Sequence, residues 1–350
     1  MKILLLLVLF SLVSCVNVND KKKRVINNHS PLHKSIFSEK KKVNEIFNPI
    51  GMAILQDYYI FQNEFGSFND CFFVYTIKDF KFCYSFGAIG QGKDEFIAPR
   101  IFNNNKENSL SIFDSAYNKI YTYEITPEKE VIVSNENIDK CVYPVQEISY
   151  VNDNSIVFLV MSNEDVTLYS YSIEDKTIVD SMRFDTGFKD LLGKDFSPIY
   201  NNFRFSNLNN KIVISFHYIN DIFITEVDIN GNFTKREHEF KNNHLDSRKS
   251  IYDNILYYSF SSAEEKYIFA QYYGYKFKRL APFPINLGER SFDFLIEVYN
   301  WEKQPIAILE LDDNFFRIFM DNKNKKILTW NPLKDFNYLS EYDISFLYEK

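Results

Sequence analysis

The chain is poor in the residue types on which metal and nucleophile sites depend. Its 350 residues include 4 Cys, 5 His, 5 Met and 2 Trp. No C-x₂-C spacing occurs, so a zinc site on paired cysteines is not predicted. A G-x-S-x-G elbow and a Ser-His-Asp order are also missing. We therefore expect no metal and no cofactor, and no catalytic residue is assigned.

Glycine and proline are scarce, at 10 residues each, and long apolar runs are almost lacking. No Pro/Gly/Ser-rich linker interrupts residues 35–350, which predicts one folded domain there. The uninterrupted apolar run is Ile3–Phe10, which is shorter than the about 20 residues of a membrane-spanning helix. Following Met1-Lys2, it is typical of a cleaved signal peptide.

The end of this segment, Leu12-Val13-Ser14-Cys15, resembles the bacterial lipobox. The resemblance implies cleavage after Ser14, so that residues 1–14 are a lipoprotein signal peptide, and lipid attachment to Cys15. Residues 15–34 are polar and without period, as in a flexible lipidated tether. Val16 is not the Asp that retains many lipoproteins at the inner membrane. By analogy we expect a cell-envelope location, in the outer membrane, with the membrane as partner through Cys15.

The formal net charge is −7, which disfavours binding to the phosphate backbone of nucleic acids. Cys71 and Cys83 flank an expected turn at 77–80. They could form a disulfide across a hairpin in an oxidising compartment, or remain buried free thiols together with Cys141, and the sequence leaves both possibilities open.

Aromatic residues are abundant, with 35 Phe and 24 Tyr, and such residues favour half-buried β-strands. A strand–link–strand–turn–strand pattern, clear at residues 110–125, returns about once every fifty residues. The second strands of these units are predicted to begin at Tyr58, Leu110, Ser155, Lys211, Tyr267 and Lys326.

These units predict an all-β fold, a six-bladed β-propeller with four antiparallel strands per blade over residues 35–350. The last unit lacks an obvious fourth strand after Tyr348. We expect the N-terminal segment 35–47 to supply that outer strand, close the ring and protect an edge. A two-domain sandwich is the alternative, but it requires a break in the chain that the sequence does not contain.

Residues 86–99, FGAIGQGKDEFIAP, resemble the G-x-G-x-x-E-F-x-x-P segment of TolB-like, NHL-related six-bladed β-propeller lipoproteins of Gram-negative bacteria. The matching residues are Gly90, Gly92, Glu95, Phe96 and Pro99. Residues 294–310 resemble the penultimate hairpin of that family, although Lys93-Asp94 stands where the family often has small residues. The resemblance implies a propeller fold and an envelope location, and no defined activity.

Two short patterns mimic known ligand sites. Residues 87–93 match G-x-x-x-x-G-K, but Asp94 follows in place of Ser or Thr and Pro99 leaves no room for a helix, so we expect a loop. Asp228-Ile229-Asn230-Gly231-Asn232 resembles the start of a calcium loop, with Glu239 at position twelve. We interpret Asn230-Gly231 as a type I′ hairpin turn instead.

Function is predicted to lie on one propeller face, where second strands lead to third strands and fourth strands lead to the next blade. Aromatic and cationic side chains there suit a peptide, glycan or protein ligand. The candidate ligand-binding residues are Lys93, Arg100, His217, Arg248, Tyr273, Arg290 and Trp330. A non-catalytic scaffold is favoured, and the alternative is an extracytoplasmic lyase or hydrolase acting at the central channel on glycan or peptide.

Overall fold

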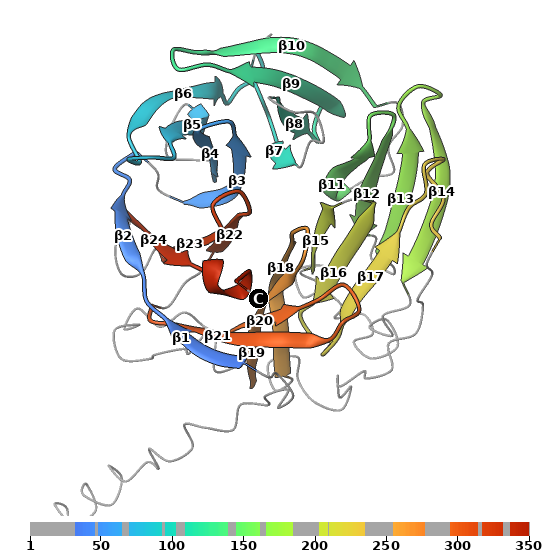
Figure 1. The fold of residues 1–350 in the computed structure, drawn as a ribbon. Helices are drawn as coiled ribbons and strands as arrows, with labels where there is room; N and C mark the ends of the chain where they lie inside the picture. Colours follow the sequence, from blue (N-terminus) through green and yellow to red (C-terminus); the bar gives the residue numbers. More distant parts are fainter. Residues whose placement is uncertain are drawn as a thin grey trace, which may run out of the picture.

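The computed structural model describes most of the chain from residue 32 onward. The described residues are 32–45, 48–64, 70–92, 95–102, 109–138, 145–161, 166–184, 203–208, 210–234, 255–276, 295–313, 317–331 and 337–349. They form β-sheets arranged in a ring around a central axis, which is a β-propeller (Figure 1). Among these residues no helix has both the length and the apolar character needed to cross a membrane.

Three four-stranded antiparallel sheets follow one another in the first half of the ring (Figure 1). The first contains β3 (Pro49–Leu55), β4 (Tyr58–Asn63), β5 (Asp70–Thr76) and β6 (Phe82–Ala88). The second contains β7 (Pro99–Phe102), β8 (Leu110–Asp114), β9 (Lys119–Ile125) and β10 (Glu130–Asn137). The third contains β11 (Val145–Asn152), β12 (Ser155–Met161), β13 (Val166–Ser172) and β14 (Thr177–Phe184).

The second half of the ring is less regular. The fourth sheet has three strands, β15 (Phe203–Leu208), β16 (Lys211–Phe216) and β17 (Ile222–Glu226). The penultimate sheet has five strands, β18 (Ile255–Ala263), β19 (Ile268–Lys276), β20 (Leu295–Tyr299), β21 (Pro305–Leu311) and β1 (Leu32–Ile36). The last sheet contains β22 (Arg317–Asp321), β23 (Lys326–Trp330), β24 (Tyr338–Asp343) and β2 (Glu39–Lys42), and the 3₁₀ helix η7 (Ser345–Leu347) follows it.

The prediction of a six-bladed propeller with four antiparallel strands in every blade is wrong. Five sheets have four or more strands, whereas the sheet β15–β17 has three strands among the described residues. After β17 the chain turns sharply, because the Asp228 carboxylate accepts hydrogen bonds from the backbone N–H groups of Asn230 and Asn232. Among the described residues after that turn, strand pairing is limited to one isolated bridge between Phe233 and Val227.

The N-terminal segment supplies the outer strand of the last sheet, as predicted, through β2, which runs antiparallel to β24 and is shorter than the predicted 35–47. The segment also forms a strand that was not predicted, β1, which runs parallel to β21 of the penultimate sheet. Figure 1 shows this segment, in blue, along the outside of both sheets. The Asp312 carboxylate, which accepts from the Ser38 N–H, fixes the passage between β1 and β2. The segment therefore ties two neighbouring sheets together.

The second strands begin where the sequence predicts, because each is a run of mainly apolar residues. β4, β8, β12, β16 and β23 start at the predicted residues, and β19 starts at Ile268, one residue late. These strands are almost wholly buried: Ile60, Ile112 and Ile156 each have 0% exposure. At about 25 cal/mol per Å² of apolar area, such residues supply much of the stability of the fold.

The core is divided into clusters that lie between neighbouring sheets. Phe72, Phe96 and Tyr121 join the first and second sheets through edge-on ring contacts. A further cluster, which contains Phe61 and Phe319, joins the first sheet to the last and so closes the ring. Large rings fill the wedge between twisted sheets, which explains the abundance of Phe and Tyr.

Candidate functional site

Four of the predicted site residues lie outside the described residues. These are Cys15, Lys93, Arg248 and Arg290. The other predicted residues, Arg100, His217, Tyr273 and Trp330, are described and lie in or beside strands β7, β16, β19 and β23.

The four described residues all lie toward the same end of the ring, as the strand topology requires. Arg100 lies at the start of β7 opposite Phe113, near the end of β8, and its side chain is exposed. His217 directly follows β16, is half-buried, and its carbonyl accepts a hydrogen bond of 2.6 Å from the Tyr257 N–H. In a propeller the second strands of all sheets run toward one face, so these positions share that face.

The other two aromatic residues are less available to a ligand. Tyr273 is half-buried and packs against the apolar cluster between the third and fourth sheets. Trp330 is only 2% exposed and packs among Phe319, Leu328 and Leu339, between the last sheet and the first. Trp330 therefore contributes to sheet packing. Of the four residues, Arg100 has an exposed side chain, whereas His217 and Tyr273 are half-buried and the Nε2 atom of His217 is buried.

The glycine-rich segment has a packing role. The Glu95 carboxylate folds back and accepts a hydrogen bond of 2.6 Å from the Gly92 N–H. A Cβ atom on Gly90 would lie 1.9 Å from Glu95 Oε2, so a larger residue there would displace the Glu95 carboxylate. Phe96 then forms a parallel bridge with Ile89 and is buried. The segment connects the first sheet to the second, and the described residues that follow it contain no helix that could bind phosphate.

The Asp228 turn needs no calcium ion. Its carboxylate is occupied by the backbone N–H groups of the turn, which also lower the pKa of Asp228. Gly231 has a positive φ of 89°, whereas the φ of Asn230 is not positive. A type I′ turn requires a positive φ at both central residues, so the turn is not the predicted type I′. Among the described residues, no group of three His, Cys, Asp or Glu side chains could hold a metal ion.

The two described cysteines are free. Phe72 is paired with Phe86 and Val74 with Tyr84, so Cys71 lies about four residues along the ladder from Cys83. Burial raises the pKa of Cys71 to about 12, and its Sγ donates to the Gly87 carbonyl oxygen at 2.9 Å. A thiol in this state is a poor nucleophile. Cys141 lies outside the described residues.

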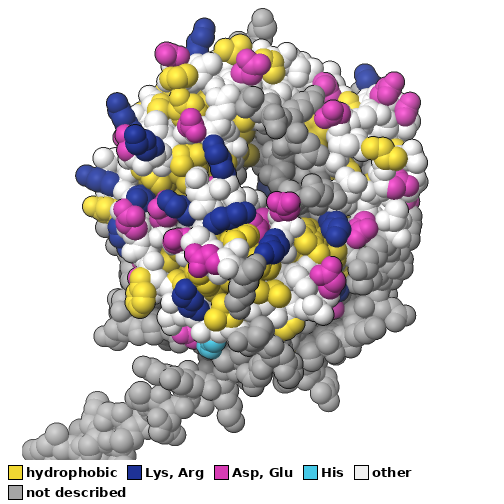
Figure 2. All heavy atoms as spheres, in the orientation of Figure 1, with side chains coloured by type: hydrophobic (Ala, Val, Ile, Leu, Met, Phe, Trp, Pro, Cys, Tyr) yellow, Lys and Arg dark blue, Asp and Glu magenta, His cyan; other side chains and the backbone are white. Residues whose placement is uncertain are grey.

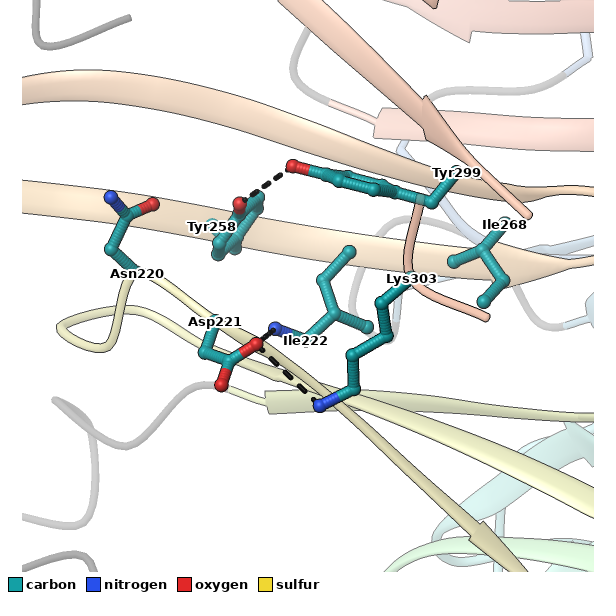
Figure 3. A pocket seen from close by; sticks show the side chains of 7 residues that line it. All are labelled: Asn220, Asp221, Ile222, Tyr258, Ile268, Tyr299 and Lys303. Carbon is teal, nitrogen blue, oxygen red and sulfur yellow. Dashed lines mark hydrogen bonds and ion pairs between the residues drawn. The ribbon is translucent and has the colours of Figure 1, made fainter. Parts of the chain in front are cut away.

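A cavity of about 140 Å³ lies between the fourth sheet and the penultimate sheet. Its lining comes from the β16–β17 link, from β17 to β20 and from the β20–β21 turn. The lining residues are Asn220, Asp221, Ile222, Tyr258, Ile268, Tyr299 and Lys303. Figure 3 shows the hydroxyl groups of Tyr258 and Tyr299 pointing toward one another in this cavity.

A buried carboxylate lies behind the two tyrosines. Glu297 is 2% exposed, and its Oε2 accepts hydrogen bonds of 2.9 Å from Tyr258 and 2.5 Å from Tyr299. The two phenol oxygens are 3.3 Å apart. Burial, followed by the charges of its two neighbours, raises the pKa of Tyr258 well above its ordinary value. Tyr258 is therefore a neutral phenol at physiological pH.

An ion pair closes the other side of the cavity. Lys303 Nζ lies 3.7 Å from Asp221 Oδ1, and the same oxygen accepts the Ile222 N–H at 2.8 Å (Figure 3). The backbone of Lys303 has a positive φ of 60°, which turns the chain back after β20 and directs the side chain toward β17. The Lys303 ammonium also lies over the Phe223 ring, 6.0 Å from its centroid.

Sequence reasoning missed most of this cavity because its residues come from separate strands. It placed 217–220 in a ligand-facing link and 301–303 in a hairpin turn, without connecting them. One signal was present: Glu297 interrupts an otherwise apolar strand, Leu295–Tyr299. A charge in a strand buried on both faces requires a partner, and here two phenols supply it.

The surface visible in Figure 2 carries basic and acidic side chains interspersed, without a large area of one sign. Two lysines pair with carboxylates that are themselves buried: Lys326 with Glu341 at 2.8 Å and Lys325 with Glu264 at 3.2 Å.

Comparisons with known proteins support the fold. No family model matches the sequence, and no curated protein matches it. A solved protein of the duf4221 family from Bacteroides vulgatus is similar with a TM-score of 0.55 and 14% identity, over 87% of this chain and 95% of that one. A protein from Bacteroides fragilis named as exported is similar with a TM-score of 0.53 and 11% identity, over 89% of this chain and 98% of that one. At these identities the likeness shows a shared fold alone.

Proposed function

We propose that this chain is an extracytoplasmic binding lipoprotein, anchored to a membrane of the cell envelope through lipid on Cys15. Its propeller binds a peptide, glycan or protein partner at the end of the ring to which the second strands run. Two features of the sequence support the location: the lipobox-like Leu12–Cys15 segment and the polar tether over 15–34. The resemblance of residues 86–99 to TolB-like propeller lipoproteins supports the same assignment.

One observation carries the proposed binding face. Arg100, exposed at the start of β7, and His217, half-buried after β16, lie at the same end of the ring although 117 positions separate them. A guanidinium group and an imidazole can donate charge-assisted hydrogen bonds to carboxylate, carbonyl or hydroxyl oxygens. Peptides and glycans present these groups.

The membrane anchor is tested by metabolic labelling with a radioactive fatty acid, followed by membrane fractionation. We expect label on the wild-type chain, recovered with the outer membrane, and neither label nor membrane association in Cys15→Ala. Label on Cys15→Ala would contradict the anchor. Recovery of the wild type with the inner membrane would contradict the outer-membrane location alone.

The binding face is tested by affinity capture from membranes with a double variant, Arg100→Ala/His217→Ala. Lys176→Ala is the matched control, because Lys176 lies in the β13–β14 turn at the opposite end of the ring. We expect a reproducible partner with the wild type and with Lys176→Ala, and its loss with the double variant. A partner retained by the double variant, or no reproducible partner at all, would contradict the proposal.

A further inference from the structure

We propose that the cavity between the fourth and penultimate sheets binds a primary ammonium group on a short alkyl chain. The cavity borders the binding face proposed above, because Asn220 and Asp221 belong to the β16–β17 link that begins at His217. Ligand binding there does not depend on a partner at the end of the ring.

The hydrogen bonds of the two tyrosines determine what the cavity offers. Each phenol has one proton, and both protons are directed to Glu297 Oε2. The two oxygens therefore present lone pairs rather than protons to the cavity. A hydrogen bond from a phenol to a carboxylate also increases the negative charge on the phenol oxygen. The base of the cavity is thus an acceptor site.

Two further lining residues add acceptor oxygens, whereas the Lys303 ammonium and the Asn220 NH₂ group are donors. Asn220 contributes an amide carbonyl oxygen, and Asp221 a carboxylate whose side chain is 39% exposed. An ammonium group has three N–H donors and no acceptor, so it can satisfy several such oxygens at once. The Tyr258 and Tyr299 rings add faces that attract a cation.

The charges around the cavity and its volume further limit which ligands can bind. Glu297 and Asp221 are acidic and Lys303 is basic, so the surroundings of the cavity are negative and repel anions. The apolar walls, Ile222 and Ile268, favour an alkyl chain over a hydrated inorganic cation. A cavity of about 140 Å³ is close to the about 150 Å³ that admits benzene, so about six non-hydrogen atoms can enter. A free alkylamine and the end of a lysine side chain both meet these requirements.

The proposal is tested by titration calorimetry on the full-length protein in detergent. The probes are n-butylammonium, sodium butyrate, tetramethylammonium and potassium chloride. We expect n-butylammonium to bind with a Kd of about 1 mM or tighter. Butyrate has the wrong charge, tetramethylammonium has no N–H donor, and potassium has no alkyl chain, so each should bind at least about tenfold more weakly. No binding of n-butylammonium, or equal binding of any other probe, would overturn the proposal.

Two variants should change the affinity for n-butylammonium in opposite directions. Tyr299→Phe removes one acceptor oxygen and keeps the ring, so n-butylammonium should bind about tenfold or more weakly. Lys303→Met keeps the aliphatic stem but removes the competing ammonium from Asp221, so binding should become severalfold tighter. Damage to the fold would weaken binding in both variants. Weaker or unchanged binding in Lys303→Met, or unchanged binding in Tyr299→Phe, would overturn the proposal.

Tyr84→Phe is the matched control, because the Tyr84 hydroxyl donates to the Thr126 carbonyl between the first and second sheets. Its affinity for n-butylammonium should equal that of the wild type. A tripeptide, acetyl-Ala-Lys-Ala-amide, and its Nε-acetylated form distinguish the two sources of the ammonium. If the lysine peptide binds and its acetylated form does not, the ligand is the side chain of a polypeptide. Binding of n-butylammonium with neither peptide identifies a small amine. Binding of the acetylated peptide as tightly as the lysine form would overturn the proposal.

Discussion

The phenol of Tyr59 in β4 donates a hydrogen bond of 2.5 Å to the carboxylate of Asp321 at the end of β22, and so joins the first sheet to the last. Both residues have 0% exposure. Asn324, in the β22–β23 turn, donates to the same carboxylate through its backbone and its side chain. Burial and the Asp321 carboxylate raise the pKa of Tyr59, so the phenol keeps its proton. This contact fixes the closure of the ring.

Tyr59→Phe should therefore lower the free energy of unfolding by about 1–3 kcal/mol, because a buried carboxylate loses one of its donors. Urea unfolding followed by tryptophan fluorescence measures this change. Tyr58→Phe is the control, because the side chain of the neighbouring Tyr58 is half-buried and its hydroxyl forms no hydrogen bond with the described residues. Equal stability of the two variants would show that the Tyr59–Asp321 contact does not support closure.

Gly90→Ala should destabilise the fold through a single contact. The added Cβ would lie 1.9 Å from Glu95 Oε2 and 2.6 Å from Glu95 Cδ, so the carboxylate must leave its place. The carboxylate ends a flexible side chain and can move aside, so we expect a loss of about 0.5–1.5 kcal/mol, that of the Glu95–Gly92 hydrogen bond. The double variant Gly90→Ala/Glu95→Ala removes the clash. Gly90→Ala should therefore lower the free energy of unfolding less in the Glu95→Ala protein than in the wild type. An additive effect of the two substitutions in urea unfolding would contradict the contact.

The segment around Gly90 shows what a sequence resemblance can and cannot predict. The G-x-G-x-x-E-F-x-x-P pattern correctly marked a connection between sheets, because its glycines, glutamate and phenylalanine act together over a few residues. The number and completeness of the blades were not predictable in the same way. The parallel pairing of β1 with β21 joins residues far apart in the chain, such as Leu32 and Ala307, so no local pattern indicates it.

The cavity was missed for a related reason. Each second strand has a local signature, a run of mainly apolar residues that recurs about once every fifty residues, and the sequence therefore located these strands. Tyr258, Glu297 and Lys303 belong to three different strands or turns, and no periodic pattern links them. The residues predicted at the end of the ring were found from their place in loops, which does not distinguish a buried residue such as Trp330 from an exposed one such as Arg100.

Cys71 should resist alkylation in the folded protein. Burial raises its pKa to about 12, so the reactive thiolate is scarce at about pH 8.5, and the buried side chain excludes the reagent. We expect iodoacetamide to leave Cys71 unmodified in buffer and to modify it fully in urea, as measured by peptide mass spectrometry. Rapid modification in buffer would contradict the buried position. A Cys71–Cys83 linked peptide would contradict the free thiols.

Asp343 should stabilise the end of the chain in a pH-dependent way. Its carboxylate accepts a hydrogen bond of 2.8 Å from the Ser345 N–H at the start of η7, which lowers the pKa of Asp343 below its ordinary value of 3.8. This stabilisation is present above that ordinary pKa and is lost as the pH falls through the lower pKa of the folded chain. Asp343→Asn should therefore reduce the melting temperature at neutral pH.

The difference between Asp343→Asn and the wild type should shrink steadily in acid, below about pH 4. Glu265→Gln is the matched control, because the Glu265 side chain is exposed and makes no interaction with the described residues. Its melting temperature should stay close to that of the wild type throughout. A difference for Asp343→Asn that does not depend on pH would indicate that the charge of Asp343 has no part in holding η7.

The attachment of the N-terminal segment should depend on Lys40 in β2. Lys40 forms an ion pair with Asp313, whose side chain is 8% exposed, and donates to the Ser340 hydroxyl at 2.5 Å. Lys40→Met keeps the aliphatic stem but leaves the buried Asp313 carboxylate without this partner. The Lys40 side chain is 47% exposed, so solvent screens the pair, and we expect a loss of about 1–2 kcal/mol, between that of an exposed pair and that of a buried one.

Lys42→Met is the matched control, because Lys42 lies two residues further along the same strand, is exposed, and has no side-chain interaction given for the described residues. Its unfolding free energy should change by less than about 0.5 kcal/mol. Limited proteolysis gives a second measurement: β2 should be cut sooner in Lys40→Met, since a strand released from β24 exposes its backbone. If both variants unfold and are cut like the wild type, the segment is held by the β2–β24 backbone pairing and by apolar contacts such as those of Val43, and the ion pair is dispensable.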